Sequence, residues 1–295
     1  AVPSPQRALN LVQRFNQKRL EQGFHTFLDS YLSWRVIFRV LKRWFRLVLI
    51  SRDLSEIKHA FKLQGSNMSL WPLMQQDWYN SMRGRAAIDN LLWIELFNTA
   101  VSDLPHQRVG FYLCENQSWE RALTHAWRKH GHGQLIAVPH STIRFWDLRF
   151  FADPRTINSS NLYPMPQADL TALSGKVAID NCLKAGYPKK AIVECEALRY
   201  LYLDKLRAGS REEKTTEEIK VLILGDYMPS CTVKMLQLLE GALPHMTVPA
   251  TYTIKPHPSY QVNPEDYPSL NLKVVTDHLE KILYNFDVAY SANKT

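Results

Sequence analysis

The feature that most constrains the fold of this chain is an alternation of strand-like and helix-like patterns. The alternation begins with a βαβ unit. A further helix follows, and then a segment that begins with a strand pattern and ends with a helix pattern. The expected elements are the strands 108–115 and 134–140, the helices 119–131 and 175–184, and the mixed segment 191–206. Parallel strands need a crossover of this length, so the pattern predicts a parallel sheet. We assign 106–207 to a Rossmann-like α/β domain.

A second alternation follows the charged segment 208–220, which has almost no large apolar residues and is typical of a linker. Its expected elements are 221–227, 230–242, 251–255, 272–277, 278–284 and 287–292. They predict a second α/β domain in 221–295. A doubly wound sheet needs more strands than these, so we expect 221–295 to be a truncated domain and the sequence to be a fragment.

Residues 1–105 are expected to form a helical region, with helices near 6–30, 31–50 and 86–102. In 31–50 the basic residues recur at steps of three and four and share one helical face. They are Arg35, Arg39, Lys42, Arg43 and Arg46. Two interpretations stay open: a helix lying on an anionic membrane surface, and a core helix with a solvated basic side. The charges in 31–50 argue against a membrane-spanning segment.

The net charge of +8 favours an anionic partner, which could be nucleic acid, anionic lipid or a phosphorylated substrate. We recognise no nucleic-acid-binding module, so nucleic acid is not expected as a partner. The 4 cysteines are scattered and form no C-x-x-C pair. They are typical of reduced thiols, which predicts a cytoplasmic protein.

Polar residues follow three expected strands of the second domain, where ligands of open α/β sheets bind. They are Gly225 with Asp226, then Lys255, Pro256, His257 and Pro258, and then Ser291, Asn293 and Thr295. Lysine supplies a point charge, histidine an N–H donor, and the prolines stiffen the loop. We therefore predict a phosphate site here; the alternative is an ordinary turn at the end of a strand.

Two pairs of motifs resemble a known family. The turn KPHP (255–258) followed by DVAYSANKT (287–295) resembles the His-Pro and Ser/Thr-rich motifs of GT-B glycosyltransferases that use CMP-activated sugars. Bacterial sialyltransferases, polysialyltransferases and capsule Kdo transferases carry versions of this pair. YLCENQSWERAL (112–123) followed by AVPHST (137–142) is similar to GT-B proteins of bacterial capsule and O-antigen biosynthesis. The resemblance covers 108–295.

The resemblance implies a GT-B fold in which two Rossmann-like domains face a cleft and the second domain binds the donor. It implies that Lys255 and His257 contact the donor phosphate, and that Ser291, Asn293 and Thr295 belong to the loop that holds it. The sequence departs from the family at Thr295, where the family continues with further small residues and a helix.

The activity that the resemblance implies is transfer of a Kdo-type or sialic-type sugar from CMP to a growing glycan or lipid-linked glycan. The enzyme would work at the inner face of the bacterial cytoplasmic membrane, with residues 31–50 as a peripheral contact. The absence of a D-x-D pair, a P-loop, a G-x-G-x-x-G and metal-ligand spacing fits an enzyme without metal or cofactor. We read HGH at 130–132 as a helix cap. The alternatives are a CDP-glycerol-type transferase, a nucleotide-sugar epimerase or a basic nucleic-acid-binding protein.

On the acceptor side, an inverting enzyme needs a base, and Glu115 is our first candidate because it ends a strand. Asn116 and Gln117 beside it are expected to bind sugar hydroxyls. The alternative is that Glu115 caps the following helix. His140 is a second candidate for catalysis or acceptor binding, against a structural role. Glu120 is read as a first-turn acid of the helix.

Overall fold

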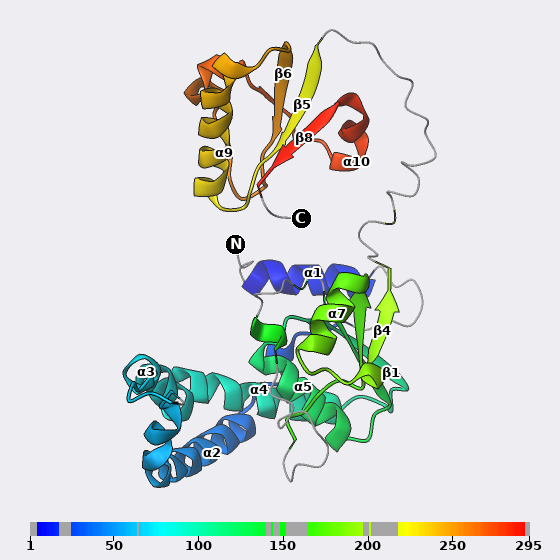
Figure 1. Cartoon of the computed structure of the whole chain (residues 1–295). Coiled ribbons are helices and arrows are strands. Elements are labelled where there is room, and N and C mark those ends of the chain that lie inside the picture. Colours follow the sequence, from blue (N-terminus) through cyan, green and yellow to red (C-terminus); the bar gives the residue numbers. More distant parts are fainter. Residues whose placement is uncertain are drawn as a thin grey trace. The chain divides into compact units, whose positions relative to one another are not determined.

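The structure, a computed structural model, describes residues 5–17, 25–63, 65–139, 143, 148–151, 164–196, 201 and 218–292. The chain divides into two compact units, Ala1–Glu196 and Ala197–Thr295, and each is described by itself (Figure 1). Each unit contains a parallel four-stranded sheet, so the chain is a mixed α/β protein, as the alternation predicts. Residues 208–217 of the predicted linker lie outside the described residues.

Helices precede the first sheet. They are α1 (Pro5–Gln17), α2 (Trp34–Asp53), α3 (Trp71–Met82) and α4 (Arg85–Ser102), with the 3-10 turns η1 (Leu28–Tyr31) and η2 (Ser55–Phe61). The predictions for 31–50 and 86–102 are confirmed within a few residues. The expected helix at 6–30 was too long, because residues 25–27 are not helical. The sequence analysis missed α3.

A buried carboxylate joins α2 to α4. Val36 and Val40 of α2 pack against Leu96 of α4, and all three are almost fully buried. Beside them Glu95 is only 1% exposed. Its two oxygens pair with the Nε atoms of Arg39 at 2.5 Å and Arg43 at 2.8 Å. Two of the five cations on the expected basic face therefore belong to the packing between these helices.

The first sheet has the order β1-β2-β3-β4. Its strands are β1 (Val109–Cys114), β2 (Gln134–Pro139), β3 (Leu170–Ser174) and β4 (Ile192–Cys195), and its helices are α5 (Ser118–Lys129) and α7 (Lys176–Lys184). The 3-10 turns η3 (Leu148–Phe150) and η4 (Lys189–Ala191) lie in its connections. The sequence analysis missed β3, while β1, β2, β4, α5 and α7 match their predicted segments within a few residues. The helical part expected in 191–206 lies largely outside the described residues.

The two faces of the first sheet differ. On one face, side chains of the strands pack against α4, α5 and α7 in two clusters, which include Cys114, Leu135 and Leu173. The other face leaves Phe111 69% and Leu113 63% exposed. A sheet whose strands follow in order places its right-handed crossovers on a single face, which explains the difference.

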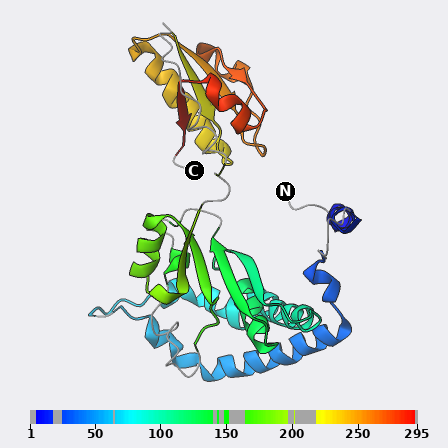
Figure 2. The same cartoon turned by 90° about the vertical axis from the view of Figure 1, so that its right-hand side faces the viewer.

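The second sheet has the order β7-β6-β5-β8. Its strands are β5 (Ile219–Leu224), β6 (Ala250–Lys255), β7 (Lys273–Val274) and β8 (Val288–Ser291), and its helices are α9 (Pro229–Ala242) and α10 (Leu279–Ile282). The 3-10 turns are η6 (Leu243–His245), η7 (Pro264–Asp266), η8 (Pro268–Leu270) and η9 (Leu283–Asn285). The helix α9 packs Met235 and Leu236 onto β5 and β6, and Figure 2 gives a second view of this sheet.

The longest described helix is α2, with 20 residues. A helix needs about 20 mainly apolar residues to cross a bilayer. The 20 residues of α2 include arginines and a lysine at six positions. No helix in the described part of the chain is long and apolar enough to cross a membrane.

The buried Glu95 predicts how α2 and α4 respond to mutation. Arg39→Ala with Arg43→Ala leaves Glu95 unpaired and should lower the free energy of unfolding by about 2–4 kcal/mol, since both arginines are partly exposed. Adding Glu95→Leu should restore most of the loss, because it removes the buried charge. The exposed pair Arg35→Ala with Lys42→Ala is the control and should change stability by about 0.5 kcal/mol or less. Urea unfolding measures all four proteins; equal loss in the two double variants would contradict the assignment.

Candidate functional site

Three strand ends meet at one edge of the second sheet. The central strand β5 pairs in parallel with β6 and β8, and the register sets Leu224 beside Lys255 on one side and Ser291 on the other. Neighbouring strands lie about 4.8 Å apart, so the Cα atoms of Lys255 and Ser291 are roughly 10 Å apart. The expected convergence of the three strand ends is therefore present. Asn293 and Thr295 lie outside the described residues.

The strand order of the second sheet reverses at β5. From β5 the chain moves outward through β6 to β7 and then returns to place β8 on the other side of β5. Open α/β sheets bind ligands in the crevice beyond the strand ends at such a reversal. The described strands of the first sheet follow in order and show no reversal. The topology therefore points to the ends of β5 and β8.

Gly225, directly after β5, allows the turn after β6 to approach closely. Its N–H donates to the carbonyl of Lys255 at 3.0 Å. A Cβ at this position would lie 3.1 Å from the His257 nitrogen and 3.2 Å from the Cα of Pro256, tighter than ordinary contacts. Glycine is the residue that permits such an approach of two backbones. Gly225 thus positions the His257 turn at the strand ends.

The loop between β5 and α9 is organised by Asp226, which is 6% exposed. Its carboxylate accepts a hydrogen bond from the N–H of Met228 at 2.8 Å. Its own N–H donates to the hydroxyl of Thr232, in the first turn of α9, at 2.8 Å. Such side-chain contacts stabilise a tight turn. They bring the first turn of α9 to the end of β5.

His257 lies in an exposed turn. The N–H of Tyr260 donates to the carbonyl of His257 at 2.9 Å, and Pro258 takes the second turn position, which suits its fixed φ. The N–H of Ser259 donates to Nδ1 at 3.2 Å, and the Ser259 hydroxyl lies 2.6 Å from the same atom. Because Nδ1 accepts, Nε2 carries the proton of the neutral ring. The Tyr227 ring lies edge-on to the imidazole with a centroid distance of 6.3 Å.

The side chain of Lys255 is hydrogen-bonded to a neighbouring loop. Its ammonium donates to the carbonyl of Asp277 at 2.5 Å and to that of Thr276 at 3.4 Å. These contacts fix the segment after β7 against the end of β6. An ammonium has three donors, so one remains for a ligand. Lys255 therefore has a structural role beside the predicted phosphate contact.

In the first unit the carboxylate that caps α5 is that of Glu120. One oxygen of Glu120 accepts the N–H groups of Glu115 at 2.7 Å and Gln117 at 2.9 Å, and Glu120 is 1% exposed. Glu120 is thus the first-turn acid that the sequence predicts. Glu115 is half-buried directly after β1, and Gln117 is exposed. His140 lies outside the described residues.

Asn116 has a left-handed backbone with φ of 55°, a conformation that asparagine tolerates better than most residues. Its amide nitrogen donates to the Tyr187 hydroxyl at 2.8 Å, and its oxygen accepts from Arg121 at 3.0 Å. Arg121 also donates to the carbonyl of Pro166 at 2.8 Å. The Asn116 side chain therefore ties the end of β1 directly to Tyr187 and, through Arg121, to Pro166. Its role in sugar binding remains a prediction.

Two protonated groups lie beside these residues. Burial, followed by the charge of Glu120, raises the pKa of the Cys114 thiol to about 12. Burial raises the pKa of Tyr187 to about 12 as well. Both groups therefore stay neutral near pH 7, and Cys114 is not an activated nucleophile.

The HGH segment closes α5. Gly131 has φ of 69°, the N–H of His132 donates to the carbonyl of Trp127, and that of Gly131 donates to Arg128. These are the two hydrogen bonds of a Schellman cap, as the sequence predicts. The His132 ring accepts from the N–H of Gln107 at 3.0 Å. No group of three potential metal-ligating side chains occurs in the described part of the chain.

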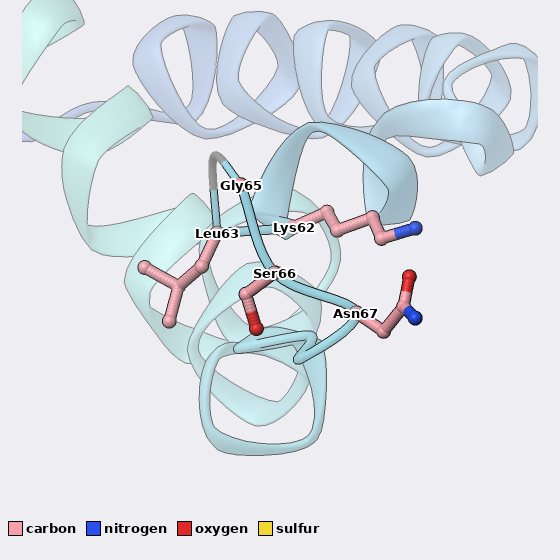
Figure 3. Close-up of a pocket in the computed structure, with 5 residues that line it drawn as sticks. All are labelled: Lys62, Leu63, Gly65, Ser66 and Asn67. Atoms are coloured by element: carbon pink, nitrogen blue, oxygen red, sulfur yellow. The ribbon is translucent and has the colours of Figure 1, made fainter.

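A surface hollow lies elsewhere in the first unit, on the loop between η2 and α3. Figure 3 shows the side chains that line it, which are Lys62, Leu63, Ser66 and Asn67, together with Gly65. Lys62 is the one ionisable group among these five residues. The residues that line the hollow therefore offer no second ionisable group beside Lys62.

No protein-family model and no curated protein matches this chain. The assignment of the candidate site therefore rests on the chemistry and geometry of its residues. The sequence analysis missed Ser259, Thr232 and Tyr187, which hold His257, the α9 turn and Asn116. Ser259 was detectable, because a residue two positions after a turn acceptor often donates to it. Tyr187 is 71 residues from Asn116 and left no local signal.

Glycines 225 and 241 form a matched pair for testing this geometry. Gly225→Ala should lower the free energy of unfolding by about 1–3 kcal/mol, because its Cβ crowds the turn backbone. Gly241→Ala, in α9 where a Cβ meets nothing within 4 Å, should raise it by up to about 1 kcal/mol. Thermal and urea unfolding give both values. A Gly225→Ala protein as stable as the parent would contradict the close approach.

Proposed function

We propose that this chain is a GT-B-type glycosyltransferase that moves a sugar from a CMP-activated donor to a surface glycan. The observation that carries the proposal is the reversal of strand order at β5, with polar residues at the ends of β5, β6 and β8. The motif resemblance is carried by residues at the ends of two of these strands, β6 and β8. A Kdo-type or sialic-type sugar, a glycan or lipid-linked acceptor and a site without a metal belong to this proposal.

In the proposed donor site, the phosphate lies beyond the end of β5. The Nε2–H of His257 donates to it; none of the described residues accepts a hydrogen bond from this atom. The Ser291 hydroxyl and the N–H of Ser230 in the first turn of α9 add donors, since Pro229 has no N–H and those of Cys231 and Thr232 donate to Met228. The helix N-terminus also favours an anion. Lys255 contributes its remaining proton and its charge.

These groups fit the leaving-group side of glycosyl transfer. The acceptor hydroxyl attacks the anomeric carbon, the bond from that carbon to the phosphate oxygen breaks, and CMP leaves with the bonding electrons. Donors aimed at the phosphate stabilise the charge that develops on it. In an inverting reaction Glu115 or His140 takes the hydroxyl proton, and Asn116 and Gln117 contact the acceptor.

The two nitrogens of His257 allow the turn and the ligand contact to be separated. His257→Asn keeps an acceptor near Nδ1 for the Ser259 N–H but loses the donor at Nε2. His257→Gln does the reverse. We expect the Asn variant to keep the parent melting temperature and to bind CMP at least tenfold more weakly, since a hydrogen bond to a charged group contributes about 1.5–3 kcal/mol. The Gln variant should bind better than the Asn variant. Calorimetric titration with CMP measures the affinities.

The same titration tests the donor class. CMP or CDP should bind and raise the melting temperature of the parent, while UMP and UDP should bind more weakly. Preferential binding of UDP would overturn the cytidine donor. Equal CMP affinity in the Asn variant and the parent would remove His257 from the site.

Cys231 offers a second test, because it lies in the first turn of α9 and is partly exposed. Bound CMP should slow its reaction with a thiol reagent at least tenfold. Cys195 is also partly exposed but belongs to the first unit, so its rate should not change. Peptide mass spectrometry after timed labelling gives both rates. Equal rates at Cys231 with and without saturating CMP would place the nucleotide elsewhere.

A further inference from the structure

The helix α2 carries a continuous apolar stripe that no described element covers. Its residues recur at steps of four, three, four and four, so they share one face of the helix. They are Trp34 at 75%, Phe38 at 68%, Leu41 at 41%, Phe45 at 60% and Leu49 at 58% exposure. Soluble proteins seldom expose large apolar groups contiguously, so this stripe indicates an interaction surface.

A row of cations flanks the stripe. Arg35, Lys42 and Arg46 are exposed, and no described carboxylate forms an ion pair with them, in contrast to Arg39 and Arg43. Residues 30–52 contain no aspartate or glutamate. Within residues 30–52 the charges beside the stripe are therefore all positive, and the exposed Asp53 follows them at the end of α2.

The stripe is separate from the face that holds α2 in the fold. Val36, Val40 and Ser51 form the buried side of the helix. At 100° per residue they lie more than about 100° from the centre of the stripe. Figures 1 and 2 both show α2 at the margin of the first unit. The helix can thus keep its contacts with α4 while the stripe binds a partner.

We propose that α2 docks on an anionic lipid surface, with the stripe inserted at the boundary between the headgroups and the acyl chains. Helices with aromatic and aliphatic residues on one face and Lys or Arg beside it lie in this way. Arg35, Lys42 and Arg46 reach lipid phosphates with their charged ends while their stems stay against apolar groups. This inference does not depend on the proposed nucleotide site.

The charges favour lipid over a second copy of this chain. A second copy would present the same cations and, within residues 30–52, no acid to pair with them. Antiparallel pairing of two such stripes about a two-fold axis sets both cationic rows on the same side, where they repel. An anionic bilayer supplies apolar depth and negative charge together.

Vesicle sedimentation of the full chain tests the proposal. The chain should pellet with vesicles of equal parts phosphatidylcholine and phosphatidylglycerol, and much less with phosphatidylcholine alone. The stripe variant Phe38→Ser with Phe45→Ser should lose about a hundredfold in partition coefficient. Its matched control is Leu238→Ser with Val177→Ser, at positions 69% and 70% exposed, and should bind like the parent.

A second pair of variants tests the charges of α2. Both variants lose three positive charges, so their net charges are equal. Removing three cations beside the stripe should weaken binding about a hundredfold, roughly fivefold for each. Removing three exposed lysines of the second unit should have less than a tenth of that effect. The two variants are Arg35→Gln with Lys42→Gln and Arg46→Gln, and Lys234→Gln with Lys273→Gln and Lys281→Gln.

Circular dichroism and melting temperatures establish that each variant is folded. Parent-like sedimentation of a folded stripe variant would overturn the proposal. So would equal losses in the two charge variants. Light scattering tests whether the stripe binds a second copy of the chain. If the parent is a dimer that does not bind vesicles, and the stripe variant is a monomer, the stripe is a dimer interface and the proposal is wrong.

Discussion

The candidate site depends on how closely two backbones approach at the end of β5. The N–H of Gly225 donates to Lys255, and a Cβ at Gly225 would crowd the backbone of the turn at His257. Parallel pairing alone sets strand ends about 4.8 Å apart. The missing side chain lets the loop after β5 and the turn after β6 meet directly. The carboxyl edge thus becomes a single polar surface.

The difference between the two sheets shows why this edge belongs to the second unit. In the first sheet the strands follow in order, their helices lie on one face, and the other face exposes Phe111 and Leu113. In the second sheet the chain reverses at β5. Loops that leave neighbouring strands in opposite directions separate from each other, and a crevice remains between them. Both sheets are parallel and four-stranded, so the distinction between their edges comes from the order of the strands.

Periodicity was enough to locate most elements, because runs such as 109–114 and 219–224 and the helix between 118 and 129 carry local signals. It failed for β3, whose five residues LTALS are too short and too polar to stand out. Strand order depends on contacts between distant residues, so the sequence predicted the convergence of three strand ends without predicting the reversal. The same limit applies inside the site. That Lys255 holds the carbonyls of Thr276 and Asp277 follows from the position of β7.

The five cations that the sequence sets on one face of α2 divide into two physical classes. Arg39 and Arg43 lie at the border of the packed face and neutralise Glu95, whose burial would otherwise cost several kcal/mol. Arg35, Lys42 and Arg46 lie farther round the helix, beside the aromatic residues, and remain exposed. The packing on α4 supports a core helix on one side, and the surface interpretation remains a proposal for the other side. At 100° per residue, a rotation of about 60° separates the mean direction of the two arginines that pair with Glu95 from that of the three other cations.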